Sequence, residues 1–270
     1  MMMCSANLKF FPQLGWADFF RASFSMQALY TVCFYIIASC IPVVSLAGTF
    51  SVNPTRIELS KGIPSAVMHV TNSGEKDTTV QLHMLQWSQI DGEDQLKASR
   101  DLIATPQIFN LPAGSRQIIR IGMLKKSDGS VEAAYRMILE EIPPPPPPGF
   151  LGLQVALKIS IPIFIKPELI SKAENNFEIN LNRSNEEEGN INLSMLNKGS
   201  SHVQLLGVKI FADDGKENLV ASYEKNLYLL AGQKKILKIN AGKKIDSKGF
   251  LIKANMNGGV VEFHAKSGVP

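Results

Sequence analysis

Cysteine is scarce in this chain, and the positions of the few cysteines exclude cysteine chemistry from most of it. The sequence contains three cysteines, Cys4, Cys33 and Cys40, all near the N-terminus. The rest of the chain therefore offers no disulfide, no thiolate nucleophile and no cysteine metal ligand. A chain of this length can form one large domain or two of about 100–120 residues, and apolar packing alone must stabilise them.

The motifs around which enzymes are commonly built are also missing. No glycine-rich phosphate loop follows an expected strand, and neither G-x-S-x-G nor H-E-x-x-H occurs. His69 and His83 fall on expected strands that could be neighbours, so a copper or zinc site is one interpretation, but no third ligand has a supporting spacing. We favour two ordinary strand histidines, and we expect no enzymatic activity, no metal and no other cofactor.

One long apolar run is present, and it lies near the N-terminus. Residues 28–47 follow two basic residues and end in small side chains, which is the pattern of a secretory signal peptide. We therefore predict a signal peptide over residues 1–47 and export of the rest of the chain. An uncleaved membrane anchor, lipidation at Cys40 and a start at Met26 are the alternatives.

Helical periodicity is hardly found after residue 50, where short alternating runs take its place. About seven such runs, separated by turn-forming residues, fall between residues 50 and 166, and this spacing is typical of an immunoglobulin-like β-sandwich. Alternation over residues 177–254 predicts a second, smaller β-sandwich. We predict an all-β protein with one domain at residues 48–166 and another at residues 167–270.

The most informative run is residues 152–166, G-L-Q-V-A-L-K-I-S-I-P-I-F-I-K. Its alternate positions form one continuous branched-aliphatic face, which predicts a single long strand. These positions include Leu153, Val155, Leu157, Ile159 and Ile161. Pro162 has no N–H to donate, so the strand cannot be paired on both sides throughout. Because a long apolar edge strand invites pairing with another chain, we infer that this strand is offered to a partner.

Three arginines interrupt apolar stretches. Arg120 and Arg136 alternate with apolar neighbours, and the simplest interpretation turns both outward on a solvated sheet face. Arg56 follows an Asn-Pro-Thr segment near the start of the first domain. The other basic residues are scattered, the formal net charge is +4, and no basic patch with interleaved aromatics predicts nucleic-acid binding.

Several segments occur together in an order that resembles a known family. They are N-P-T-R-I-E-L at 53–59, A-T-P at 104–106, L-P-A-G at 111–114, Y-R-M-I-L-E-E-I-P-P at 135–144, L-Q-V-A-L at 153–157 and I-F-I-K-P at 163–167. This combination resembles the PapD-like periplasmic pilus chaperones of the chaperone–usher pathway, and it spans nearly the whole first domain. The second domain matches in architecture and length. The resemblance implies two immunoglobulin-like domains in an L or boomerang arrangement.

The resemblance also implies a mode of action, donor-strand complementation. Members bind pilus or fimbrial subunits whose own sandwich lacks its last strand, and they lend an edge strand that corresponds to residues 152–161 here. Leu153, Val155 and Leu157 would be the inserted side chains, and Arg56 would hold the terminal carboxylate of the subunit. An outer-membrane usher would then receive the complex in the periplasm. The free chaperone could cover its edge by self-association.

One position departs from the family. Its best-known members carry a lysine, the second carboxylate ligand, where this chain has Pro162. Arg120, Lys158 or Lys166 could replace it, and we favour Arg120. Together with the prolines at 143–148, the departure resembles the archaic or spore-coat-like branch. The alternative function is a structural fibre or adhesin-type sandwich of the cell envelope, but a pilin would carry its alternating segment at the N-terminus, whereas here it is internal.

Overall fold

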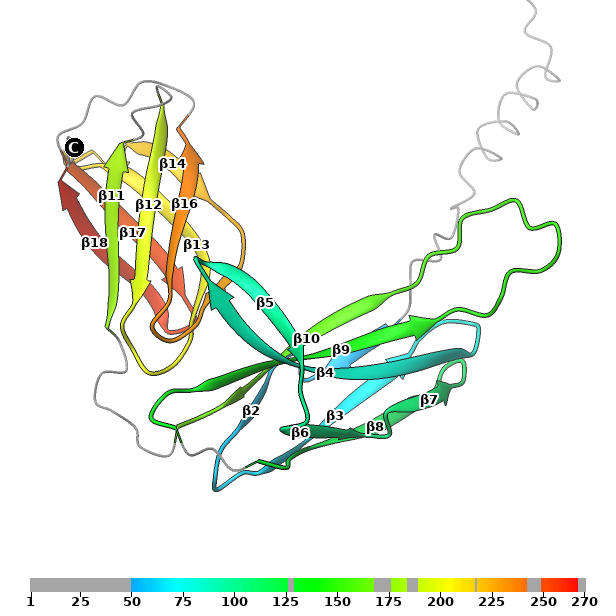
Figure 1. The fold of residues 1–270 in the computed structure, drawn as a ribbon. Helices are drawn as coiled ribbons and strands as arrows, with labels where there is room; N and C mark the ends of the chain where they lie inside the picture. Colours follow the sequence, from blue (N-terminus) through cyan, green and yellow to red (C-terminus); the bar gives the residue numbers. More distant parts are fainter. Residues whose placement is uncertain are drawn as a thin grey trace, which may run out of the picture. The chain divides into compact units, whose positions relative to one another are not determined.

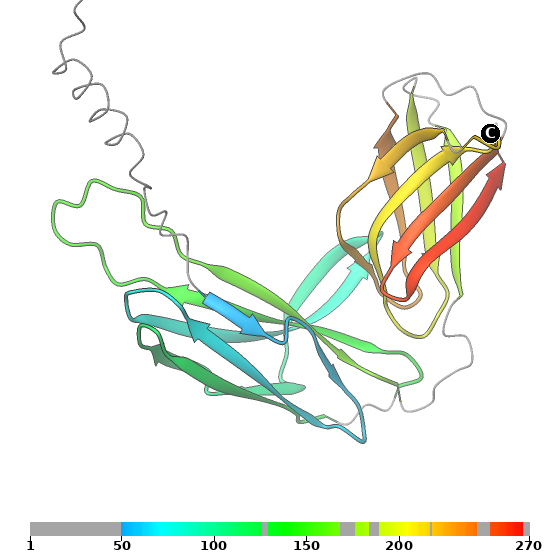
Figure 2. The same cartoon turned by 180° about the vertical axis from the view of Figure 1, so that it is seen from behind.

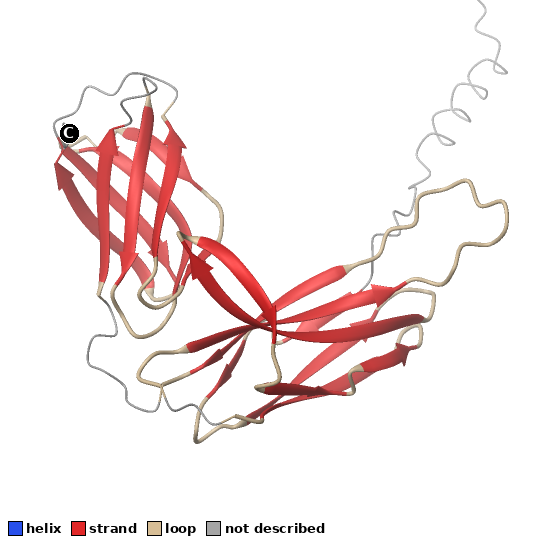
Figure 3. Cartoon of the chain, viewed as in Figure 1, coloured by secondary structure: helices blue, strands red, loops and turns tan. Residues whose placement is uncertain are grey.

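The described part of the chain is built from strands. The computed structural model describes residues 50–125, 129–167, 176–183, 189–216, 218–241 and 249–266. Every helix or strand assigned in these ranges is a strand, as Figure 3 shows, which confirms the all-β prediction. No helix in the described ranges is long and apolar enough to cross a membrane. The predicted signal peptide lies outside the described residues.

Strands β1 to β10 form the first sandwich, which consists of two sheets (Figure 1). One sheet has the strand order β1 (Phe50–Asn53), β3 (Ser65–Asn72), β8 (Arg116–Met123) and β6 (Leu102–Thr105). The other has the order β2 (Ile57–Leu59), β10 (Lys158–Ile165), β9 (Ala133–Ile142), β4 (Thr78–Ile90) and β5 (Glu93–Ala98), and β7 (Ile108–Leu111) pairs with β4. Neighbouring strands are mostly distant in sequence, as in immunoglobulin-like sandwiches.

Alternation of side chains places the core of this sandwich between its sheets. In β8, Ile119 and Ile121 are fully buried, whereas Ile118 and Arg120 face solvent. Strand β9 differs, because residues on both of its faces are buried, including Ile138 and its neighbours. A strand that is covered on both faces reads as a nearly continuous apolar run rather than as a clean alternation. Strand β9 accordingly contains three consecutive buried apolar residues, Met137, Ile138 and Leu139.

Strands β11 to β18 form the second sandwich, coloured yellow-green to red in Figure 2. One sheet has the order β11 (Phe177–Arg183), β12 (Asn190–Asn197) and β16 (Lys234–Asn240). The other has the order β14 (Leu219–Tyr223), β13 (Val203–Ala212), β17 (Gly249–Met256) and β18 (Gly259–Lys266), and β15 (Leu227–Leu229) pairs with β13. Ile191, Leu193 and Phe250 are fully buried in its core. The prediction of two β-sandwiches is confirmed.

The long strand predicted over residues 152–166 is shorter in the structure. β10 begins at Lys158, and the preceding residues 151–157 belong to no strand. The neighbouring strand explains the difference, because β9 ends at Ile142 and the chain continues into the prolines at 143–148. Prolines have no N–H to donate to a ladder, so β9 cannot continue beside the alternating segment. The segment therefore extends beyond its partner.

An asparagine plays the same part in both sandwiches. Asn72 and Asn197 each end a strand and are 1% exposed. Their side-chain amides donate to Leu111 O at 3.1 Å and to Leu229 O at 3.0 Å, respectively. Each side-chain oxygen also accepts the N–H of the glycine two residues further on. The partner turns correspond as well, since L-P-A-G begins at Leu111 and L-L-A-G at Leu229.

We expect Asn197→Leu to lower the free energy of unfolding by roughly 2–4 kcal/mol, because each buried polar group left without a partner costs about 1–3 kcal/mol. Urea denaturation followed by circular dichroism measures this loss. The control is Asn180→Leu, an exposed position on β11, which should change the unfolding free energy by less than about 0.5 kcal/mol. Equal stability of the two variants would show that the hydrogen bonds of Asn197 do not stabilise the second sandwich.

Candidate functional site

The first half of β10 has one free edge. In its second half, residues 163–165 pair with β9 on one side and, in parallel, with β2 on the other. Within the described part of the chain, residues 158–162 pair with β9 alone. The change falls directly after Pro162, so the residue without an N–H lies where no second neighbour requires one. The expectation that this strand is not paired on both sides throughout is correct.

The five side chains predicted for the lent strand fall into two groups. Ile161 is 2% exposed and Ile159 packs against the core, so both already stabilise the first sandwich. Leu153 and Val155 precede β10 and are 87% and 73% exposed. Leu157 lies between the groups and is half-buried. The segment before β10 therefore presents apolar side chains that the sandwich itself does not use.

A small apolar hollow lies beside this segment at the rim of the first sandwich. Its lining consists of Phe50, Val70, Val80, Leu139, Glu141, Leu157 and Ile159. Glu141 fixes the segment here, because its backbone N donates to Leu157 O at 2.9 Å and its Oε2 accepts the N–H of Leu157 at 3.1 Å. The exposed side chains thus begin directly beyond the end of the core.

A pocket of about 620 Å³ contains two arginines, and we call it the basic pocket. Its lining consists of Asn53, Pro54, Thr55, Arg56, Arg136, Ser160, Pro162, Gln204, Asn226 and Tyr228. Both sandwiches contribute, within the compact unit Gly48–Pro270. Arg56 donates from Nη1 to Gln204 Oε1 at 3.4 Å, and its Nη2 lies 3.1 Å from Glu58 Oε1. The predicted anchor Arg56 is therefore held from two sides beside β10.

The second arginine of the basic pocket is Arg136, on β9. It pairs in register with Pro162, and its Cζ lies 3.7 Å from the ring centre of Trp87 and 5.5 Å from that of Tyr228. Burial lowers the pKa of Arg136 from its ordinary value, but a guanidinium remains charged at neutral pH. The expectation of a solvated outward position is wrong for this residue, because aromatic rings cover that face of the sheet. The sequence had not singled out Arg136 as an anchor, but it lines the basic pocket.

Arg120 does not join the basic pocket. It lies exposed on β8, opposite Val67 and Thr105, in the sheet that does not contain β10. Our preference for Arg120 as the second anchor therefore lacks the geometry it needs, and Arg136 has that geometry. Of the other candidates, Lys158 does not line the pocket, and its Nζ lies 3.5 Å from Glu140 Oε2.

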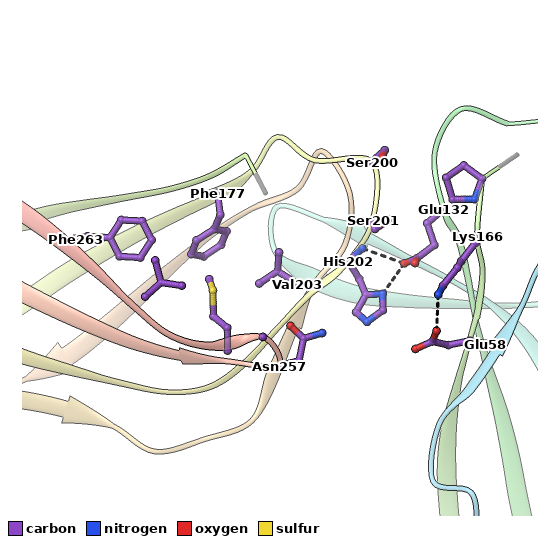
Figure 4. Close-up of a pocket in the computed structure, with 14 residues that line it drawn as sticks. Glu58, Glu132, Lys166, Phe177, Ser200, Ser201, His202, Val203, Asn257 and Phe263 are labelled. Carbon is purple, nitrogen blue, oxygen red and sulfur yellow. Dashed lines mark hydrogen bonds and ion pairs between the residues drawn. The ribbon is translucent and has the colours of Figure 1, made fainter. Parts of the chain in front are cut away.

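Lys166 forms an ion pair with Glu58, as Figure 4 shows. Its Nζ lies 2.9 Å from Glu58 Oε2, while the other oxygen faces Arg56. The hydrogen bond from Lys166 lowers the pKa of Glu58 from its ordinary value, and the charges of Lys166 and Arg56 act in the same direction. Glu58 thus neutralises part of the positive charge at this end of the site.

A buried pair lies next to these residues (Figure 4). His202 Nδ1 lies 2.6 Å from Glu132 Oε1, which also accepts the backbone N–H of His202 at 3.0 Å. Their side chains are 7% and 4% exposed. The imidazole stacks on Phe164 with ring centres 3.6 Å apart. Glu132 and Phe164 come from the first sandwich and His202 from the second, so this pair connects them.

Metal binding receives no support from the described ranges, where no group of three or more His, Cys, Asp or Glu side chains could hold an ion. His69 lies on β3 and His83 on β4, and these strands belong to different sheets. The expectation that their strands could be neighbours is therefore wrong. His83 Nε2 instead lies 3.5 Å from Glu140 Oε2.

Residues 49–171 match the family model of the PapD N-terminal domain, described as a pili and flagellar-assembly chaperone. The first sandwich belongs to the PapD family. The second sandwich lies outside the matched residues, which are less than half of the chain. No curated protein sequence matches it.

Solved structures of pilus chaperones share the fold of this chain. One is the CsuC–CsuE chaperone–tip adhesin complex from archaic Csu pili of Acinetobacter baumannii, at 17% identity over 82% of this chain and 100% of that chain, with a TM-score of 0.58. The YadV chaperone follows at 16% identity, 81% and 99% coverage and a TM-score of 0.57. The SafA pilin complex with the SafB chaperone from Salmonella enterica is 17% identical over 82% of this chain and 97% of that chain, with a TM-score of 0.55. At these identities the likeness concerns the fold.

We expect Glu58 to contribute to the pH dependence of stability. Because its pKa is lower in the folded chain, the ionised carboxylate favours folding above the ordinary carboxyl pKa, and this contribution disappears as the pH falls through the lowered pKa. Glu58→Gln should lower the unfolding free energy at neutral pH by less than about 1 kcal/mol, since the group is partly exposed. It should also reduce the loss of stability in acid. Urea denaturation at several pH values measures both, and a variant with the wild-type pH profile would contradict the expectation.

Proposed function

We propose that this chain holds incomplete pilus subunits in the periplasm by lending them its own edge strand, and that it delivers them to an outer-membrane usher. The observation that carries the proposal is the apolar segment before β10. Leu153 and Val155 are exposed there, and they run directly into a strand with a free edge. A partner that lacks one strand can pair with such an edge and bury these side chains.

The energetics suit a carrier. Burying a fully exposed Leu or Val contributes about 1.5–3 kcal/mol, so Leu153 and Val155 together supply about 3–6 kcal/mol before costs. Ordering the segment and losing free motion consume part of this gain. Main-chain hydrogen bonds along residues 151–157 add to it. The resulting complex would be firm, yet another strand of similar pattern could replace the lent one.

The basic pocket supports the second part of the proposal, recognition of a terminal carboxylate. Arg56 and Arg136 present two guanidinium groups beside β10, and a guanidinium fork matches the two oxygens of a carboxylate. Arg136 takes the role for which the sequence had favoured Arg120. A subunit whose last residue sits in this pocket has its register along the lent strand fixed, because one end of the pairing is defined.

The proposed location and delivery step rest on the family and on the leader. Pilus chaperones of the PapD type act in the periplasm, and the apolar run at residues 28–47 has the pattern of a signal peptide. An usher is the natural recipient, because a subunit held by a lent strand needs a place where a permanent strand can replace it.

We expect Val155→Glu to abolish co-purification of pilus subunits from the periplasm of the natural host. Burying an unpaired charged side chain in the groove of a subunit is strongly unfavourable. Val155 is exposed in the free chaperone, so the same charge should not disturb its folding. Affinity purification with mass spectrometry of bound proteins is the measurement. Val67→Glu, an exposed valine on β3, is the control and should retain the subunits. Subunit recovery with Val155→Glu equal to wild type would sink the lent-strand mechanism.

We expect Arg56→Ala and Arg136→Gln each to weaken subunit capture by about 10- to 100-fold, because a charge-assisted hydrogen bond contributes about 1.5–3 kcal/mol. Arg120→Ala should leave capture intact. Circular dichroism checks that each variant is folded, and binding of a purified subunit at several concentrations gives the affinity. Loss of capture in Arg120→Ala with none in Arg136→Gln would reverse our assignment of the second anchor.

A further inference from the structure

The β4–β5 hairpin extends beyond the sheet to which it belongs. β4 pairs with β9 from Thr79 to Trp87, and after Trp87 only β5 accompanies it within the described residues. The end of the hairpin reaches the second sandwich, where Lys235 Nζ donates to Gly92 O at 2.5 Å. A Cβ at Gly92 would come within 3.0 Å of Lys234 O, so the approach is close. The hairpin thus contacts both sandwiches.

Gln89, near the end of β4, fixes the chain of the second sandwich. Its side chain is 6% exposed. Its Oε1 accepts the backbone N–H of Leu230 at 2.9 Å, and its Nε2 donates to Tyr228 O and to Asp94 Oδ1, both at 2.9 Å. A buried amide with three partners resists displacement, because each partner left unsatisfied is costly. Gln89 therefore holds the backbone on both sides of Leu229, where β15 ends.

Trp87 lies two residues earlier, on the same face of β4. It is 3% exposed, and its ring meets Tyr228 edge-on with ring centres 5.6 Å apart and an interplanar angle of 82°. The guanidinium of Arg136 lies over this indole at 3.7 Å. Trp87 Nε1 has no hydrogen-bond partner among the described residues, so ring contacts define what this side chain contributes.

Neither of these two residues lines the basic pocket, but each contacts residues that do. Gln89 fixes the backbone of Tyr228, and Trp87 fixes its ring and the plane of Arg136. We propose that Gln89 and Trp87 are positioning residues that assemble the basic pocket before a subunit arrives. The inference rests on the proposed carboxylate recognition. Preorganisation of this kind raises affinity because less freedom is lost on binding.

The test uses two synthetic peptides of alternating valine and threonine, one ending in a free carboxylate and the other in an amide. Fluorescence anisotropy measures their binding to the full chain. The wild type should prefer the carboxylate peptide by about tenfold or more, corresponding to one well-placed charge-assisted bond. In Gln89→Leu this preference should fall to nearly one. The affinity for the amide peptide should not change, because this peptide pairs with residues 151–157, and Gln89 bonds to Asp94, Tyr228 and Leu230 instead.

The controls separate the possible outcomes. Gln86→Leu makes the same change at an exposed position of β4 and should keep the preference. If Gln89→Leu does not fold, Gln89→Glu, which retains the acceptor for Leu230 but not the donor to Tyr228, takes its place. A wild type without preference would refute carboxylate recognition and this inference with it. A preference that survives in the Gln89 variant, or an equal loss for both peptides, would overturn the positioning role alone.

Discussion

The rest of the structure depends on β10, because within the described residues its first half pairs with one neighbouring strand, β9. Backbone N–H and C=O groups that leave water need partners, and prolines remove partners twice near β10, at 143–148 and at Pro162. The sandwich consequently commits Ile161 to its core and leaves Val155 outside. Proteins often place charged side chains on a free edge, but Lys158, the charged residue at the start of β10, lies beside Glu140 on β9. Within the described residues, this edge therefore stays unpaired.

The contacts between the sandwiches include both apolar and polar buried groups. Such a combination can stabilise and align a pocket that is lined by residues of the two sandwiches. Phe164 is 0% exposed and belongs to a cluster with Trp87 and Leu230, which supplies apolar burial. The His202–Glu132 pair and Gln89 add hydrogen bonds with strict geometry. Buried polar pairs contribute little net stability, since desolvation offsets their attraction, but a wrong alignment leaves them unsatisfied and is costly. They therefore define position more than they add stability.

The sequence predicted the strands well and their surroundings less well. Alternation located the sandwiches and the branched-aliphatic face that ends in Ile163 and Ile165, because these side chains alternate with the period of a strand and are buried in the core. It failed at residues 152–157, where the pattern is right but the prolines leave no neighbour. It also failed at Arg136, because alternation tells which face a side chain occupies and not whether another part of the chain covers that face. The correspondence between the turns at Leu111 and Leu229 was readable in the sequence, as a shared L-x-A-G.

The two arginines of the basic pocket differ in their electrostatic surroundings, and Arg136 has more to gain from a bound carboxylate. Arg56 has Glu58 at 3.1 Å, and Glu58 also holds Lys166, so that end is largely neutral. No carboxylate in the described ranges forms an ion pair with Arg136; burial lowers the pKa of its guanidinium, and the charges of Asp94 and Tyr228 act in the opposite direction. The faces of Trp87 and Tyr228 compensate part of the lost hydration through cation–π attraction. A half-buried cation of this kind gains more from an arriving carboxylate than a solvated one does, since much of its desolvation has already occurred. Folding thus includes the unfavourable desolvation of Arg136, and binding of the partner adds the favourable attraction between the guanidinium and the carboxylate.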